Sequence, residues 1–214
     1  MGQTAALRRQ MIELRRDMLI KLLLTTCLAV MLMTAACRGG GVSISDAPAP
    51  PESREPSKNA EALAYYTAGV WLAEEGYIEE AIDRYEKALG LNPRYAAAYN
   101  NLGTIYSSLG QYQPAIQNFN ESISLNSQHP VTYYNRGNAN DGLGEFQQAV
   151  QDYTEAVRLD PLYKVAYGNR AISNTLLGKE FLAQLDVDRA VELGVNRASL
   201  MAAIDQAITN GTKR

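Results

Sequence analysis

The chain has 214 residues, of which 46% are hydrophobic and 20% are charged, and its formal net charge is −3. This is the composition of an ordinary globular protein, so it neither requires disorder nor indicates a fibre. A mildly acidic chain whose basic residues cluster only near its N-terminus also argues against nucleic acid as the main partner.

Residues 1–36 differ from the rest of the chain. A basic stretch, LRRQMIELRRDMLIK, precedes the uncharged stretch LLLTTCLAVMLMTAA at 22–36. A membrane-spanning helix would need about 20 apolar residues, and this run ends sooner, in small residues and glycine. Residues 1–36 are therefore predicted to be a signal peptide that is removed on export.

Cys37 lies at the end of this segment, in TAACRGGG at 34–41. Ala35, Ala36 and Cys37 resemble the lipobox of bacterial lipoproteins, whereas Thr34 stands where that family has leucine. The resemblance implies a lipid on Cys37 that holds the protein on the cell envelope membrane, facing the periplasm or the exterior. Thr34 leaves open a soluble secreted or periplasmic protein that is cut here without lipid.

Cys27, the other cysteine, would leave with the signal peptide. The mature chain would then keep one cysteine and could form no internal disulfide. Residues 37–60 contain four of the eight prolines and few apolar residues, so we expect the lipidated cysteine to be followed by a disordered linker.

A 34-residue repeat follows the linker without gaps, at 62–95, 96–129, 130–163 and 164–197. Position 4 is tyrosine, position 8 is small, position 15 is glycine, position 20 is alanine and position 24 is large. Small residues at 8 and 20 would let two helices pack closely against the residue at 24, and the glycine would form the turn between them.

These repeats resemble the tetratricopeptide repeat, which implies an all-α, right-handed superhelix (α-solenoid) of four helix pairs. Residues 198–214 are expected to form a capping helix and a tail, with Leu200, Ile204 and Ile208 facing inward.

Two repeats share a pair of charged residues. Position 7 is Arg136 and Arg170 in the third and fourth repeats, and position 23 of the same repeats is Asp152 and Asp186. We predict the ion pairs Arg136 to Asp152 and Arg170 to Asp186 between the helices of each pair.

The sequence offers no catalytic arrangement. His129 is the only histidine, and we find no phosphate-binding loop or cluster of metal ligands. We therefore expect a non-enzymatic protein that needs no cofactor or metal and acts as a scaffold for other proteins.

The resemblance places the binding surface on the inner, concave face, at positions 2, 5, 6, 9, 12 and 13 of the first helices. The candidate residues for a peptide-binding groove are Tyr66, Asn100, Asn101, Thr104, Tyr134, Asn135, Asn138 and Asn169. Asparagine both donates and accepts, so a row of asparagines could hold the backbone of an extended peptide. The alternative is that asparagine at these positions is a generic part of the repeat.

The best-known ligand site of the family, a clamp for C-terminal carboxylates, needs lysine and arginine where this chain has Tyr66, Val131 and Asn135. The expected groove charges, Glu74 and Asp141, favour a neutral or basic partner. Trp71 lies on the open edge of the first repeat, where it either caps that edge or contacts a second subunit.

Overall fold

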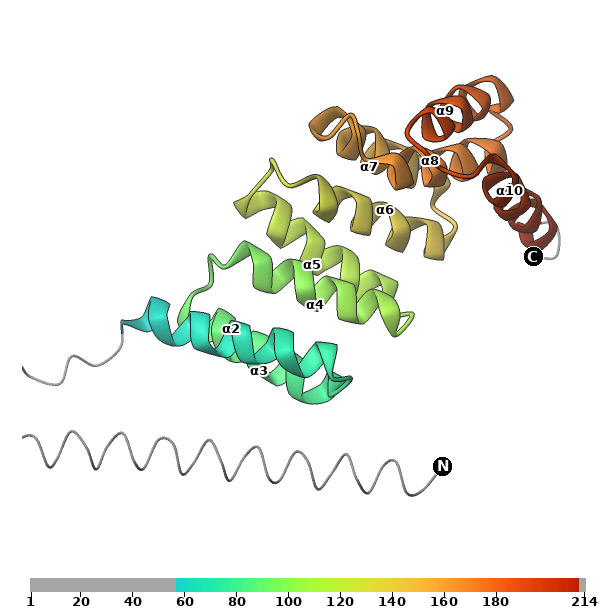
Figure 1. Cartoon of the computed structure of the whole chain (residues 1–214). Helices are drawn as coiled ribbons and strands as arrows, with labels where there is room; N and C mark the ends of the chain where they lie inside the picture. The colour runs from blue at the N-terminus through green and yellow to red at the C-terminus, as the bar shows by residue number, and fades with distance from the viewer. Residues whose placement is uncertain (1–56, 212–214) are drawn as a thin grey trace, which may run out of the picture. The chain divides into compact units, whose positions relative to one another are not determined.

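The structure, a computed structural model, describes residues 57–211, and the regular structure in that range is entirely helical (Figure 1). The predicted signal peptide, Cys37 and nearly all of the predicted linker lie outside the described residues. The helices of the described range are α2 (Lys58–Glu74), α3 (Ile78–Leu91), α4 (Ala96–Ser108), α5 (Tyr112–Leu125), α6 (Pro130–Leu143), α7 (Phe146–Leu159), α8 (Lys164–Leu176), α9 (Glu180–Glu192) and α10 (Arg197–Gly211).

The helices pack in pairs that follow the chain order. The pairs are α2 with α3, α4 with α5, α6 with α7 and α8 with α9, and each new pair packs its first helix mainly on the second helix of the pair before it. The predicted all-α array of four helix pairs with one further helix is confirmed. Because a single pair leaves an apolar face uncovered, its stability depends on this stacking.

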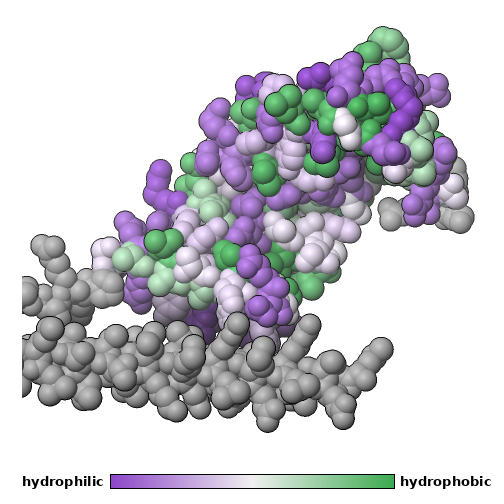
Figure 2. Space-filling model, viewed as in Figure 1, coloured by the Kyte–Doolittle hydropathy of each residue, from purple (hydrophilic) through white to green (hydrophobic). Residues whose placement is uncertain are grey.

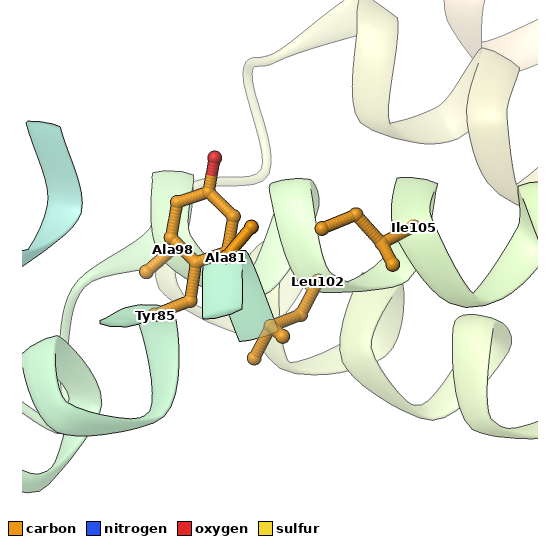
Figure 3. Packing of buried hydrophobic residues seen from close by; sticks show 5 residues of the cluster. All are labelled: Ala81, Tyr85, Ala98, Leu102 and Ile105. Carbon is orange, nitrogen blue, oxygen red and sulfur yellow. The ribbon is translucent and has the colours of Figure 1, made fainter. Parts of the chain in front are cut away.

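The first three pairs are held together where a glycine meets an aromatic ring, whereas the fourth pair has Ala171 and Val187 at these positions. A Cβ atom built on Gly103 would lie 2.6 Å from Cε1 of Phe119, and one on Gly137 would lie 2.6 Å from Cε1 of Tyr153. Only glycine allows the ring of the second helix to lie this close to the first. Figure 3 shows the corresponding ring of Tyr85 beside alanines of α3 and α4 in the core between the first two pairs.

The four glycines at position 15 form the turns within the pairs, as predicted. Gly76, Gly110, Gly144 and Gly178 have φ angles of 84°, 73°, 79° and 70°. This left-handed conformation is strained for other residues, which explains why the turn keeps glycine in every repeat.

Both predicted ion pairs are present. Arg136 Nη2 lies 2.6 Å from Asp152 Oδ1, and Arg170 Nη2 lies 2.6 Å from Asp186 Oδ1. Asp152 and Asp186 are buried, and each also accepts a hydrogen bond from an asparagine of the first helix, Asn140 and Asn174 respectively. The charge of each buried carboxylate is thus balanced by an arginine, as its burial requires, although the Oδ1 atom of Asn174 is buried without a hydrogen-bond partner within the described residues.

The two ends of the array differ from the sequence-based expectation. α2 begins at Lys58, inside the segment expected to be linker, because the Ser57 side chain caps it by accepting from the Ala60 amide at 3.3 Å. At the other end Leu200 and Ile204 are buried against the fourth pair, but the inward position expected for Ile208 is wrong, since it is 42% exposed. α10 packs mainly on α8 and only slightly on α9.

Candidate functional site

The surface formed by the first helices of the pairs, which the resemblance predicts to be the inner face and which we call by that name, carries a row of asparagines that link neighbouring repeats. Asn101 on α4 donates to the hydroxyls of Tyr66 (3.4 Å) and Tyr85 (3.1 Å) in the first pair. Asn135 on α6 donates to Asn100 Oδ1 (3.4 Å) and Thr104 Oγ1 (3.3 Å) on α4.

Asn169 on α8 continues the row. It donates to the Tyr134 hydroxyl (3.3 Å) and to Asn138 Oδ1 (2.8 Å) on α6. The structure therefore brings the eight predicted groove residues together along the first helices in two hydrogen-bonded groups, Tyr66 with Asn100, Asn101, Thr104 and Asn135, and Tyr134 with Asn138 and Asn169. We call these two groups together the asparagine network.

This network changes the chemistry that the asparagines can offer. Each of Asn101, Asn135 and Asn169 uses both of its amide hydrogens in bonds to the preceding repeat. Within residues 57–211 the side-chain oxygens of Asn135 and Asn169 accept no hydrogen bond. The asparagines therefore act as braces between repeats, and what they retain for a ligand is acceptor capacity.

Two pairs of packed tyrosine rings lie on this face, and the two members of each pair have the same separation in the sequence. The Tyr66 ring packs on Tyr95 with centroids 4.7 Å apart, and the Tyr134 ring packs on Tyr163 with centroids 5.1 Å apart. Tyr95 and Tyr163 were not among the predicted site residues. They could have been found from the sequence, because tyrosines at repeat positions 5 and 34 occur together in the first repeat and again in the third.

A hollow of about 200 Å³ lies beside the first of these tyrosine pairs. Its lining comprises Tyr66, Ala96, Ala97, Asn100, Asn101, Ser122, Asn126 and His129. His129 was not predicted to take part, and its Nδ1 lies 2.8 Å from Thr132 Oγ1. The hollow combines an aromatic wall with amide groups, which suits an uncharged polar segment of a peptide.

The other end of the inner face contains a partly buried carboxyl group. Asp141 Oδ2 lies 2.7 Å from the Tyr153 hydroxyl, and Ser173 donates to Asp141 Oδ1 at 2.8 Å. Burial raises the pKa of Asp141 to about 6, although both hydroxyls favour its charged form. The same burial, with Asp141 nearby, raises the pKa of Tyr153, which keeps this tyrosine protonated.

A larger hollow of about 490 Å³ adjoins Asp141. It is lined by Asp141, Leu143, Gly144, Phe146, Ile172, Leu176, Ala207 and Asn210. α10 supplies one wall because it packs on α8. The two ends of the inner face thus differ, with tyrosines and amides at one end and apolar side chains around a carboxyl group at the other.

The remaining predicted residues have mixed outcomes. Trp71 is 52% exposed, so it covers the edge of the first repeat only in part. Cys37 lies outside the described residues. Among residues 57–211 there is no group of acidic, cysteine and histidine side chains that could hold a metal ion, and none of the helices there is long and apolar enough to cross a membrane.

Stacked helix pairs with a polar inner face define a class of protein, the helical repeat scaffolds. Two family profiles, both described as tetratricopeptide repeat, match residues 75–128 and 130–163. The chain thus contains tetratricopeptide repeats over these residues. Proteins of this family are generally non-enzymatic, and their domains bind peptides and proteins. A comparison with curated proteins gives no match.

Several solved structures share the fold. The crystal structure of MamA is 24% identical, with a TM-score of 0.60 over 62% of this chain and 77% of that one. YrrB, described as a TPR protein with an unusual peptide-binding site, is 22% identical, with a TM-score of 0.60 over 66% and 73%. The first TPR of Spaghetti (RPAP3), bound to the HSP90 peptide SRMEEVD, is 25% identical, with a TM-score of 0.55 over 56% and 95%.

Proposed function

We propose that this protein is a non-enzymatic scaffold that binds an extended peptide or a helix of another envelope protein on its inner face, and that a lipid on Cys37 anchors it to the membrane. The observation that carries the binding part is the network of asparagines and tyrosines along α2, α4, α6 and α8. The anchoring part rests on the sequence around Cys37. A peptide ligand agrees with the peptide bound to Spaghetti and with the peptide-binding site of YrrB.

The network also indicates the chemistry of the ligand. Since the amide hydrogens of the three bracing asparagines are used internally, a ligand must bring donors to Asn135 and Asn169. Backbone N–H groups of an extended peptide are such donors, and so are lysine side chains. The carboxyl group of Asp141 adds negative charge at one end, which favours a neutral or basic segment over an acidic one.

The binding surface is tested by blocking it without breaking the braces. Ala97 is exposed and lines the hollow beside Tyr66, so Ala97→Arg fills that hollow and removes no hydrogen bond. Gln117→Arg places the same side chain on an exposed site of α5 and is the matched control. Cross-linking in cells followed by mass spectrometry should lose partners with Ala97→Arg alone. A partner list that is the same for both variants would refute the inner-face site.

A soluble secreted or periplasmic assembly factor is the second candidate. It is favoured by Thr34, which stands where the lipoprotein pattern has leucine. The intact mass of the mature protein separates the two. Diacylglyceryl mass on Cys37 with the protein in the membrane fraction supports the anchor, whereas an unmodified chain in the soluble fraction rejects it.

A further inference from the structure

The outer face of the fourth pair carries apolar side chains that the other pairs lack. Phe181, Leu182 and Leu185 on α9 are 75%, 46% and 52% exposed. They occupy repeat positions 18, 19 and 22. The same positions in the other repeats hold Glu79, Glu80 and Asp83, then Gln113, Pro114 and Gln117, then Gln147, Gln148 and Gln151.

The fold does not require apolar residues at these positions. The second helices of the other three pairs have charged residues, glutamines or proline there, so these positions of the repeat are on the solvent side of the helix. In repeats one to three the residue before them, at position 17, is Ile78, Tyr112 or Phe146, whereas repeat four has Glu180 there and its aromatic residue one place later. Three adjoining exposed apolar side chains of this kind mark an interaction surface.

A groove lies next to these side chains. It measures about 310 Å³ and runs between α7 and α9, with Val150, Thr154, Leu182 and Leu185 among its lining residues and the Arg170–Asp186 ion pair at its base. Figure 2 shows hydrophobic atoms among the hydrophilic ones at the end of the array that contains α9. One face thus presents a protruding aromatic side chain beside an apolar groove.

We propose that this face, formed by α9 and the α7–α9 groove, binds a second copy of the same chain. A twofold interface needs a surface that is complementary to itself, and an aromatic protrusion next to a groove meets that need. Phe181 of each protomer enters the groove of its partner, where the rims supplied by Val150 and Leu185 cover the ring.

The charges of α9 give the pairing its direction. Lys179, Leu182, Leu185 and Asp188 are spaced by three residues and form one row along the helix surface. When two such rows meet in opposite directions, Leu182 faces the partner's Leu185 and Lys179 faces the partner's Asp188. Within its own chain Lys179 Nζ donates to Gln147 Oε1 at 2.8 Å and Asp188 Oδ1 accepts from Arg197 Nη2 at 2.6 Å, so the contact between chains adds a second partner to each charge. The corresponding rows of the other repeats do not place opposite charges at their two ends with apolar residues between them. These rows are Tyr77, Glu80, Asp83 and Glu86 in repeat one, Gln111, Pro114, Gln117 and Asn120 in repeat two, and Glu145, Gln148, Gln151 and Thr154 in repeat three.

The area of this face indicates how tightly the proposed dimer should associate. A standard interface buries about 800 Å² per partner and uses about 20–30 residues on each side, more than one helix and a groove provide. The dimer is therefore weak, with a dissociation constant on the order of micromolar. This inference is independent of the proposed peptide site, which lies on the opposite, first-helix side of the pairs.

Analytical ultracentrifugation tests the dimer. The mature chain carries Cys37→Ser, so that no lipid drives association, and is studied from about 1 to about 300 µM. The sedimentation coefficient should rise with concentration, and Phe181→Glu should weaken association at least about tenfold. Phe181 is exposed enough that this change leaves the fold intact, which circular dichroism checks, and Gln113→Glu at the same position of the second repeat should have no effect.

A charge exchange tests the direction of pairing. Lys179→Asp should weaken the dimer by placing two carboxylates together, and adding Asp188→Lys should restore it. Because Asp188 also pairs with Arg197 at 2.6 Å, Asp188→Lys alone is included as a control, and thermal unfolding checks that each variant keeps the fold. A chain that stays monomeric throughout, or a dimer that Phe181→Glu leaves unchanged, overturns the proposal. A dimer lost with Trp71→Glu instead would place the contact on the first repeat and would overturn it equally. Ala97→Arg, which blocks the inner face, should leave association unchanged.

Discussion

Removing Arg136 tests whether the ion pair inside the third helix pair stabilises the fold. Asp152 is 4% exposed and receives hydrogen bonds from Arg136 Nε at 3.1 Å and from Nη2 at 2.6 Å. In Arg136→Leu the remaining donor to this carboxylate within the described range is Asn140 Nδ2 at 2.9 Å. Breaking a buried pair in this way costs about 3–5 kcal/mol, because a charge is left buried without its partner.

The second repeat provides the template for a compensating change. It has Leu102 and Asn118 at the positions of Arg136 and Asp152, and it folds into the same pair. The double variant Arg136→Leu/Asp152→Asn should therefore recover most of the lost stability, to within about 1 kcal/mol of the parent chain, because no buried charge remains.

Urea and thermal unfolding followed by circular dichroism measure these effects. A loss of about 3 kcal/mol lowers the melting temperature of a domain of this size by about 6–12 °C. Arg158→Leu is the control, since Arg158 forms an exposed pair with Glu155, and its loss should leave the unfolding curve unchanged.

The single variant should also depend on pH more steeply than the parent. Burial already raises the pKa of Asp152 in the presence of Arg136, and without the arginine this pKa rises further. The variant therefore loses more stability at pH 8 than at pH 5. A single variant as stable as the parent, or a double variant no better than the single one, would refute this account of the pair.

Three further predictions follow from the structure. The pKa of Asp141 is raised on folding from 3.8 to about 6, so the folded chain holds more protons between these values, and stability should fall as the pH rises from about 4 to about 6. Asp141→Asn should remove this slope and raise stability at pH 8, as measured by urea unfolding at each pH; an unchanged slope would show that another group causes it. Gly137→Ala should destabilise the fold by about 1–3 kcal/mol, since its Cβ would lie 2.6 Å from a ring carbon of Tyr153. Gly90→Ala should instead stabilise α3 by about 0.5–1 kcal/mol, since outside the local helix backbone no atom lies within 4 Å of the added Cβ. The acidic peptide SRMEEVD should show no binding in calorimetry, because the chain lacks the basic clamp residues; binding in the micromolar range would refute the expected charge preference.

The sequence was sufficient to predict the repeat architecture, because its evidence is local and repeated four times. A glycine at position 8 and a ring at position 24 meet in each of the first three repeats, and the glycine at position 15 has the same turn conformation in all four. The ion pairs were equally predictable, since Arg136 with Asp152 and Arg170 with Asp186 appear together in two repeats and are absent together from the other two.

The site was predicted less completely. The candidate residues were placed on the correct helices by the repeat pattern, yet the pattern does not say where hydrogen bonds go. Asn101, Asn135 and Asn169 bond backwards to the preceding repeat, so their donors are used before any ligand arrives. This depends on the offset between one first helix and the next, which is a property of the stacked array.

The sequence by itself thus determined which residues lie within a helix pair and which lie between pairs, because close packing of glycine against rings leaves few alternatives. Only the tertiary structure decided which polar groups remain free, that Asp141 is buried enough for its pKa to rise, and that α10 packs on α8 while α9 keeps its outer face exposed. These features depend on the distances between elements far apart in the chain. The features that all four repeats share carry no information about how the last repeat ends.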